Sequence, residues 1–207
     1  MNDDKSQTES FSDEQSVEFD GEPRESKIRV VIANEQSTLA IDESQFQAAV
    51  ASVFRESSYD SGIVSIAVVD DPTIHEINRQ YLEHDFPTDV LSFVLEDRQP
   101  YLEGELVVST DTASANAAEY DWPASSELLL YVIHGALHLV GFRDKKSDEI
   151  VVMRAAEAQT LRELGVALPN GSSRWTDVAR INESANESAN ESVIKSAGES
   201  SRKARSS

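Results

Sequence analysis

The residues of this chain that are best suited to chemistry lie between positions 134 and 144. His134 and His138 are four residues apart, Gly141 follows, and Asp144 comes three residues later. Side chains at positions i and i+4 share one face of an α-helix, so both imidazoles can point at one ion. A glycine just past a helix can take the left-handed conformation that reverses the chain and brings the carboxylate back. The spacing predicts a divalent metal site with His134, His138 and Asp144 as ligands.

The ligand set also limits the kind of metal chemistry. Three protein ligands leave a fourth position for water, which is typical of catalytic zinc, whereas structural zinc is usually closed by four residues. The chain contains no cysteine, so a closed thiolate site is excluded. Gly135 follows His134 directly, so the glutamate of the His-Glu-x-x-His peptidases is absent. Peptidase chemistry of that type is therefore disfavoured.

A simpler interpretation stays open for each of these residues. Either histidine could be a hydrogen-bonded core residue, and Asp144 could be an ordinary cap of the helix that follows. His75 and His84 have no ligand spacing, and we expect them on an exposed helix and in a loop.

The composition along the chain indicates one domain with two tails. The chain has 207 residues, and residues 1–26 are rich in Ser, Asp and Glu, which predicts a disordered acidic tail. Residues 168–207 contain a short Asn-Glu-Ser-Ala repeat and a basic end, which predicts a second, low-complexity disordered tail. The globular domain is therefore expected over residues 27–167.

The charge balance restricts the possible partners. The formal net charge is −20, and residues 27–167 carry 24 acidic and 10 basic residues, which argues against broad nucleic-acid binding. Arg143, Lys145 and Lys146 flank Asp144 and could form a local basic groove, although an ordinary solvated helix start would look the same. There is no apolar run long enough to cross a bilayer and no signal-peptide pattern, so we expect a cytoplasmic protein without a membrane partner.

The hydrophobic patterns predict an α+β domain in which a mixed sheet is covered by helices. Strands come mainly first and helices mainly last, with a helix that begins at Asp71-Pro72 between two of the strands. The helix that carries the histidines is apolar on most sides, so we expect it to be the central buried helix. Strands are expected over residues 27–34, 62–70, 89–95 and 102–109, and helices around 46–54, from 71, and over 112–119, 125–140 and 147–164.

Two long motifs resemble the YbeY family of bacterial rRNA maturation factors. The family pattern His-Gly-x-Leu-His-Leu-x-Gly-Tyr/Phe is present from His134 through Phe142. A second block matches at Asn78, Tyr81, Asp85 and the run Pro87-Thr-Asp-Val-Leu-Ser-Phe93, and Gly104-Glu-Leu stands where the family has Gly-Asp-Ile/Leu. The resemblance covers roughly residues 27–167.

The chain departs from the family at two places that concern activity. Asp144 stands where the family has its third metal-binding histidine, and Arg143 stands where the family has an aspartate. A carboxylate is an accepted zinc ligand, and it shifts the preference of the site toward harder cations. Leu82 replaces a family arginine that is thought to serve catalysis or RNA contact, and Arg79 lies one turn earlier as a candidate replacement.

The resemblance implies a four-stranded mixed sheet with a zincin-like, central His-bearing helix, and a metal-dependent endoribonuclease specific for single strands. It implies one Zn²⁺ per chain, held by His134, His138 and Asp144, with His134 and Arg79 as catalytic candidates. The implied partners are single-stranded rRNA and the small ribosomal subunit, not DNA, with roles in 16S rRNA 3′-end maturation and ribosome quality control. As residues that match the family, Thr88, Asp89 and Ser92 could line the substrate cleft. Arg143, Lys145 and Lys146 are substrate-binding candidates because of their positive charge beside Asp144, not because of the resemblance.

The same residues are compatible with other roles. Thr88 and Asp89 are also ordinary turn-forming residues before a strand. The loss of the arginine at Leu82 and the acidic surface are compatible with a noncatalytic, metal-binding ribosome-assembly factor. The acidic charge is also compatible with a metallohydrolase that acts on a substrate other than a nucleic acid.

Overall fold

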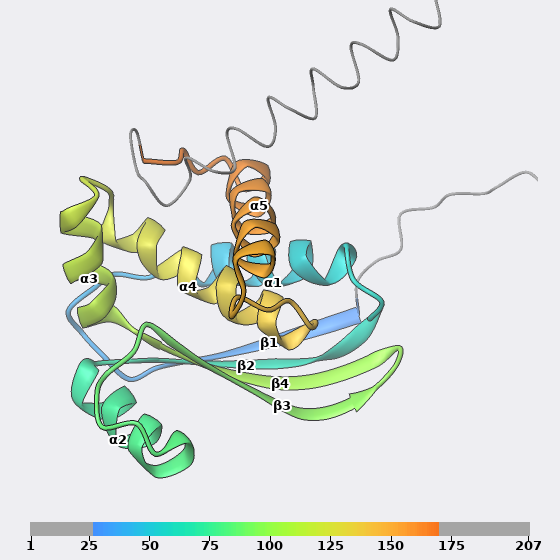
Figure 1. Cartoon of the computed structure of the whole chain (residues 1–207), viewed down its shortest axis with the longest axis horizontal. Helices are drawn as coiled ribbons and strands as arrows, with labels where there is room; N and C mark the ends of the chain where they lie inside the picture. The colour runs from blue at the N-terminus through green and yellow to red at the C-terminus, as the bar shows by residue number, and fades with distance from the viewer. Residues whose placement is uncertain (1–26, 170–207) are drawn as a thin grey trace, which may run out of the picture.

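The structure, a computed structural model, describes residues 27–169 (Figure 1). The predicted tail 1–26, and the predicted tail 168–207 apart from its first two residues, lie outside the described residues. The elements follow in the order β1 (Lys27–Asn34), α1 (Glu43–Arg55), β2 (Ser61–Val69), α2 (Asp71–Leu82), β3 (Val90–Arg98), β4 (Tyr101–Ser109), α3 (Thr110–Glu119), α4 (Ala124–Leu139) and α5 (Ser147–Glu163).

The strands form one mixed sheet within the described residues. Its strand order is β1-β2-β4-β3. β2 is parallel to both β1 and β4, whereas β3 pairs antiparallel with β4 and shows a register shift between Val94 and Glu96. Alternate residues of β2 are buried, as expected for a strand with one face on the main core. The predicted α+β class with a four-stranded mixed sheet is confirmed.

The helices cover the two faces of the sheet unequally. Figure 1 shows α1, α3, α4 and α5 on one face and α2 on the other. The main core lies between the sheet and the four helices, and a smaller core of Val69, Ile74, Leu91 and Val107 lies under α2. α4 contacts α1, α3, α5, β3 and β4, and most of its residues are buried. The prediction of a central buried helix that carries the histidines is confirmed.

Two glycines let α4 lie unusually close to the sheet. A Cβ atom on Gly135 would lie 2.8 Å from Leu106 Cδ2 and 2.9 Å from Val90 Cγ2, and one on Gly104 would lie 2.7 Å from Leu139 Cδ1. Position 135 therefore faces β3 and β4. A glutamate at that position would enter the packed interface between α4 and the sheet, which explains physically why the peptidase glutamate is absent.

The chain reverses immediately after α4. Gly141 has a φ of 101°, the left-handed conformation expected from the sequence, and the Phe142 N–H donates to the Leu137 carbonyl at 3.0 Å. The Glu149 carboxylate then accepts from the backbone N–H groups of Lys145 and Lys146 at 3.1 and 3.2 Å. These bonds fix the loop that carries residues 141–146 at both of its ends.

None of the helices in residues 27–169 combines the length and the hydrophobicity that crossing a membrane requires.

Candidate metal centre

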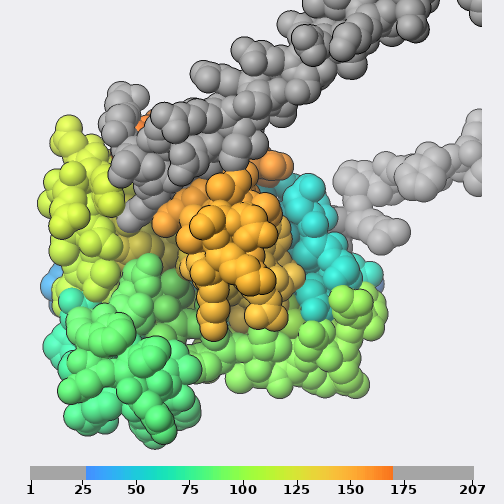
Figure 2. Space-filling view, in the orientation of Figure 1, coloured from blue at the N-terminus to red at the C-terminus, as the bar shows by residue number. Residues whose placement is uncertain are grey.

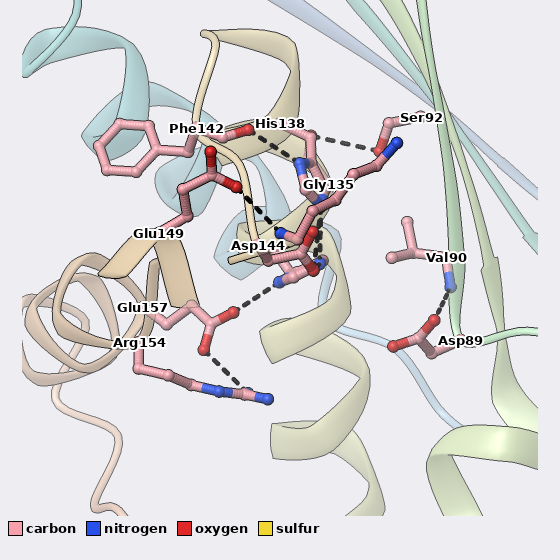
Figure 3. Close-up of polar contacts among 12 residues, drawn as sticks. Asp89, Val90, Ser92, Gly135, His138, Phe142, Asp144, Glu149, Arg154 and Glu157 are labelled. Atoms are coloured by element: carbon pink, nitrogen blue, oxygen red, sulfur yellow. Dashed lines mark hydrogen bonds and ion pairs between the residues drawn. The ribbon is translucent and has the colours of Figure 1, made fainter. Parts of the chain in front are cut away.

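Three potential ligand atoms meet at the C-terminal end of α4 (Figure 3). His134 Nε2 and His138 Nε2 are 2.9 Å apart. Asp144 Oδ2 lies 3.5 Å from His134 Nε2 and 3.7 Å from His138 Nε2. All three side chains are partly exposed, at 18%, 29% and 39%. The structure thus brings together the three residues that the spacing singled out and leaves them open to solvent.

A buried carboxylate orients the first histidine. His134 Nδ1 lies 2.6 Å from Glu157 Oε1, and the side chain of Glu157 is fully buried. The other carboxylate oxygen accepts from Arg154 Nη1 at 3.2 Å. Because an ionised carboxylate only accepts hydrogen bonds, His134 must carry its proton on Nδ1, which leaves the lone pair of Nε2 available for a metal.

The turn after α4 orients the second histidine. His138 Nδ1 lies 3.0 Å from the carbonyl oxygen of Phe142. A carbonyl oxygen can only accept, so His138 also has its proton on Nδ1 and its Nε2 lone pair directed at the site. Gly141 therefore contributes twice, because its turn brings Asp144 back and places the Phe142 carbonyl on His138.

The surroundings of His134 favour its protonated form when no cation is bound. Burial lowers the pKa of His134, but the hydrogen bond and charge of Glu157 raise it, as do the charges of Asp89 and Asp144, and the net pKa is raised above its usual 6.5. A concentration of negative charge that attracts a proton also attracts a metal cation. The electrostatics of the site are therefore those of a cation site.

The residues present fit a divalent metal ion. Two neutral imidazole nitrogens and one carboxylate oxygen form a donor set that zinc accepts. Glu157 and the Phe142 carbonyl supply the outer hydrogen bonds that metal-binding histidines almost always have. The carboxylate of Asp144 adds a hard oxygen donor, which suits Mn²⁺ as well as Zn²⁺.

Reasoning from the sequence missed Glu157. A signal for it was present, since Glu157 lies between Met153 and Leu161 at helical spacing, and both of these are buried in the core. A glutamate in the apolar stripe of a helix must find a partner, because an unpaired buried charge is costly. The pattern indicates a buried carboxylate, but only the fold shows that its partner is His134.

The start of β3 forms one wall beside the metal centre (Figure 3). Asp89 accepts from the Thr88 hydroxyl and from the Val90 N–H, each at 2.9 Å, and its charge acts on His134. The Ser92 hydroxyl donates to the Gly135 carbonyl at 3.4 Å, which ties β3 to α4. These contacts agree with the turn-forming interpretation of Thr88 and Asp89, and they also place Asp89 and Ser92 near the site.

The three basic residues around Asp144 are exposed. Arg143 and Lys145 line a cavity of about 210 Å³ together with His138 and Asp144. Lys146 is 75% exposed and its ammonium lies 3.6 Å from Glu149. Arg143 and Lys145 are therefore placed at the opening of the metal centre, whereas Lys146 belongs to the start of α5.

The structure does not bring Arg79 to the three ligands. Arg79 lies on α2, which covers the opposite face of the sheet from α4, and it pairs with Glu76 at 2.5 Å. Leu82, at the position of the family arginine, is 46% exposed. His75 is partly exposed and pairs with Asp85 at 2.9 Å, and His84 is exposed and stacks on Phe86 with ring centroids 5.4 Å apart. Neither His75 nor His84 belongs to the metal centre.

Comparison with known proteins gives consistent matches over the described domain. The sequence model of the family described as Endoribonuclease YbeY matches residues 31–165. A relative from Rhodopirellula baltica, named endoribonuclease YbeY, is 48% identical over 125 residues, which cover 59% of this chain and 64% of that protein. Relatives of the same name from Pelotomaculum thermopropionicum and Carboxydothermus hydrogenoformans are 34% and 36% identical, and the matches cover 97% and 96% of those proteins and 66% and 65% of this chain.

The match to the Rhodopirellula protein spans slightly less than two thirds of that protein's length. Among solved structures, the solution structure of TM1509 from Thermotoga maritima is similar, with a TM-score of 0.47 and 26% identity. That similarity covers 70% of this chain and 99% of the Thermotoga chain.

Proposed function

The chain belongs to the endoribonuclease YbeY family, and from this membership we propose that it is a metal-dependent endoribonuclease that hydrolyses phosphodiester bonds in single-stranded RNA. The observation that carries the proposal is the convergence of His134 Nε2, His138 Nε2 and Asp144 Oδ2 within 4.8 Å of one another in an accessible position. A site of this kind combines a cation with access for a large substrate.

The metal in this proposal is Zn²⁺, one ion per chain, held by His134, His138 and Asp144. When bound by these residues, a divalent ion would supply an activated water and would stabilise the negative charge that grows on a phosphoryl oxygen. Phosphodiester hydrolysis needs both effects. The carboxylate of Asp144 widens the range of acceptable ions toward harder cations.

The chain's own residues position the reacting groups. Glu157 and the Phe142 carbonyl hold the two imidazole rings with their Nε2 atoms toward the site. Arg143 and Lys145, exposed at the opening, supply positive charge for the phosphates on either side of the cleaved bond. This local pair compensates for an otherwise acidic chain. Asp89 and Ser92 contribute the opposite wall, along which the RNA strand passes.

The biological substrate in this proposal is rRNA in the cytoplasm, with the small ribosomal subunit as the partner and 16S rRNA 3′-end maturation as the task. Family membership supports this context. Single-stranded RNA suits the open geometry of the site. The phosphate groups of an unpaired strand can reach the three ligands, and no groove shaped to hold a double helix is needed.

The proposal is tested by the variant His134→Ala, with His84→Ala as the matched control. His84 is exposed and lies outside the metal centre. We expect His134→Ala to lose both bound metal and cleavage of a single-stranded rRNA fragment, while His84→Ala keeps both and the two variants show the same circular dichroism. Full cleavage by His134→Ala would overturn the proposal.

A further inference from the structure

A second cavity lies directly beside the metal centre. It has a volume of about 450 Å³ and is lined by Val140, Gly141, Phe142, Arg143, Asp148, Glu149 and Val152. Gly141, Phe142 and Arg143 also line the smaller cavity that contains His138 and Asp144. The two cavities therefore share a wall, and a molecule that spans them would have one end at the metal ligands.

The chemistry of the second cavity differs from that of the first. Its apolar surface comes from Val140, Phe142 and Val152. Val152 is 56% exposed, so an apolar side chain faces solvent on a chain that is otherwise strongly charged. A Cβ atom on Gly141 would meet nothing within 4 Å, so this rim of the cavity is open. An open, partly apolar surface next to charged residues suits a flat ring that is polar only at its edge.

Two carboxylates lie at the edge of the cavity, and they are not equivalent. Glu149 is engaged, because its Oε2 accepts from the backbone N–H groups of Lys145 and Lys146 and its Oε1 lies 3.6 Å from the Lys146 ammonium. Asp148 lies one position earlier at the exposed start of α5 and lines the cavity. Its carboxylate is the acceptor best placed to read a hydrogen-bond donor on a ligand.

The position of the cavity relative to the other wall gives it a place on the substrate path. In Figure 3, Phe142 and Glu149 lie on one side of Asp144, and Asp89 and Ser92 lie on the other. Figure 2 shows α5, in orange, at the surface of the described domain. An RNA strand that runs from β3 across the three metal ligands would next reach the second cavity.

We propose that this second cavity is a nucleobase subsite that holds the unpaired base next to the cleaved phosphate, and that Asp148 makes it prefer guanine over uracil. This inference rests on the proposed function of the metal centre. The base lies against Val152 and Phe142, and Arg143, which lines both cavities, contacts the phosphate between them. Guanine offers adjacent N1–H and N2–H donors that match the two oxygens of a carboxylate, whereas uracil offers only N3–H.

The test is RNA binding by the full chain, measured by fluorescence anisotropy with a chelator present so that no cleavage occurs. The probes are a short labelled oligouridine and the same oligomer with guanosine at alternate positions. Val152→Trp fills the cavity from an exposed helix position, and Ile150→Trp is its control, because Ile150 is 40% exposed on the same helix and does not line the cavity.

Asp148→Asn keeps the shape of the carboxylate and removes its charge, and Asp60→Asn is a control at an exposed aspartate beside β2, remote from the site in the sequence. We expect Val152→Trp to weaken binding of both oligomers and Ile150→Trp to leave it unchanged. The guanosine oligomer should bind the parent protein about fivefold more tightly than oligouridine, the lower end of discrimination for a solvated contact. Asp148→Asn should remove this preference, whereas Asp60→Asn should keep it.

Equal binding by the two tryptophan variants would overturn the subsite, and a guanine preference that survives Asp148→Asn, or is absent from the parent protein, would overturn the assignment of Asp148. Failure of the proposed function looks different. In that case the protein does not cleave RNA in the presence of metal, whatever the binding assay shows.

Discussion

Replacing Glu157 by glutamine tests whether the buried carboxylate sets the affinity of the metal centre. Glu157 accepts from two donors, His134 Nδ1 at 2.6 Å and Arg154 Nη1 at 3.2 Å. A glutamine has one accepting oxygen and one donating NH₂ group. It can satisfy one of these donors, but its NH₂ then faces the other, so two partly buried donors meet.

The size of the effect follows from this mismatch. Changing a residue that orients a metal ligand typically lowers metal affinity by about 10- to 100-fold, which corresponds to about 1.4–2.8 kcal/mol. The loss of a partner by a fully buried donor costs about 1–3 kcal/mol, and the partial exposure of His134 and Arg154 puts this effect at the lower end of that range. The negative charge that raises the pKa of His134 is removed as well, so the ring becomes a poorer ligand.

The assay is a competition titration of Zn²⁺ between the protein and a coloured chelator. Glu163→Gln is the matched control, because it makes the same change on the same helix while Glu163 contacts Ser52, Arg55 and Gln159 outside the metal centre. We expect about a 10- to 100-fold rise in Kd for Glu157→Gln and an unchanged Kd for Glu163→Gln. Equal Kd values for Glu157→Gln and the parent protein would refute the role given to Glu157.

Three further changes have defined outcomes. Asp144→His supplies a third imidazole and should raise the affinity for Zn²⁺ relative to Mn²⁺ in the same titration, and an unchanged ratio would contradict Asp144 as a ligand. Gly135→Ala gains about 1 kcal/mol of helix propensity but places a methyl 2.8 Å from Leu106 Cδ2, at a cost of about 1–3 kcal/mol. Urea unfolding should therefore show net destabilisation. A more stable variant would contradict this, and would mean that the interface between α4 and the sheet rearranges to accept the methyl group.

The third change is Glu163→Gln, whose effect on stability should depend on pH. At neutral pH it should destabilise the domain by at most about 1 kcal/mol, because the ion pair between Glu163 and Arg55 is largely exposed. Hydrogen bonds from Ser52 and Gln159 lower the pKa of Glu163. A lowered pKa contributes stability that is present above the ordinary value of 4.5 and is lost as the pH falls through the folded value. The difference between variant and parent should therefore vanish below that range, and a difference that persists in acid would contradict this account.

Local patterns predicted the elements of the domain well, but not their arrangement in space. Asp71-Pro72 predicted the start of α2, and the helix does begin at Asp71, but its N-cap is Asp70, whose carboxylate accepts from the Thr73 N–H at 3.0 Å. The α3 helix begins at Thr110, two residues before the predicted start, because the Ser109 side chain caps it. The strand order β1-β2-β4-β3 depends on pairings between distant segments, which alternation within one strand does not encode.

The same division holds for the candidate site. His134, His138 and Asp144 are close in sequence and joined by one helix turn and one glycine, so local geometry was enough to predict that they meet. Glu157 comes from the next helix, and its contact with His134 depends on how α5 packs on α4. The orientation of Gly135 toward β3 and β4 likewise depends on how α4 packs on the sheet, which the local sequence does not encode.

If the proposed function is right, cleavage of RNA depends on a metal held by His134, His138 and Asp144. The most direct measurement is cleavage of a single-stranded rRNA fragment with blocked ends, by purified protein whose metal content is known, before and after treatment with a chelator. We predict internal cuts that disappear as the metal is removed and return when Zn²⁺ is restored to one ion per chain. Undiminished cleavage by protein from which the metal has been removed would contradict the account.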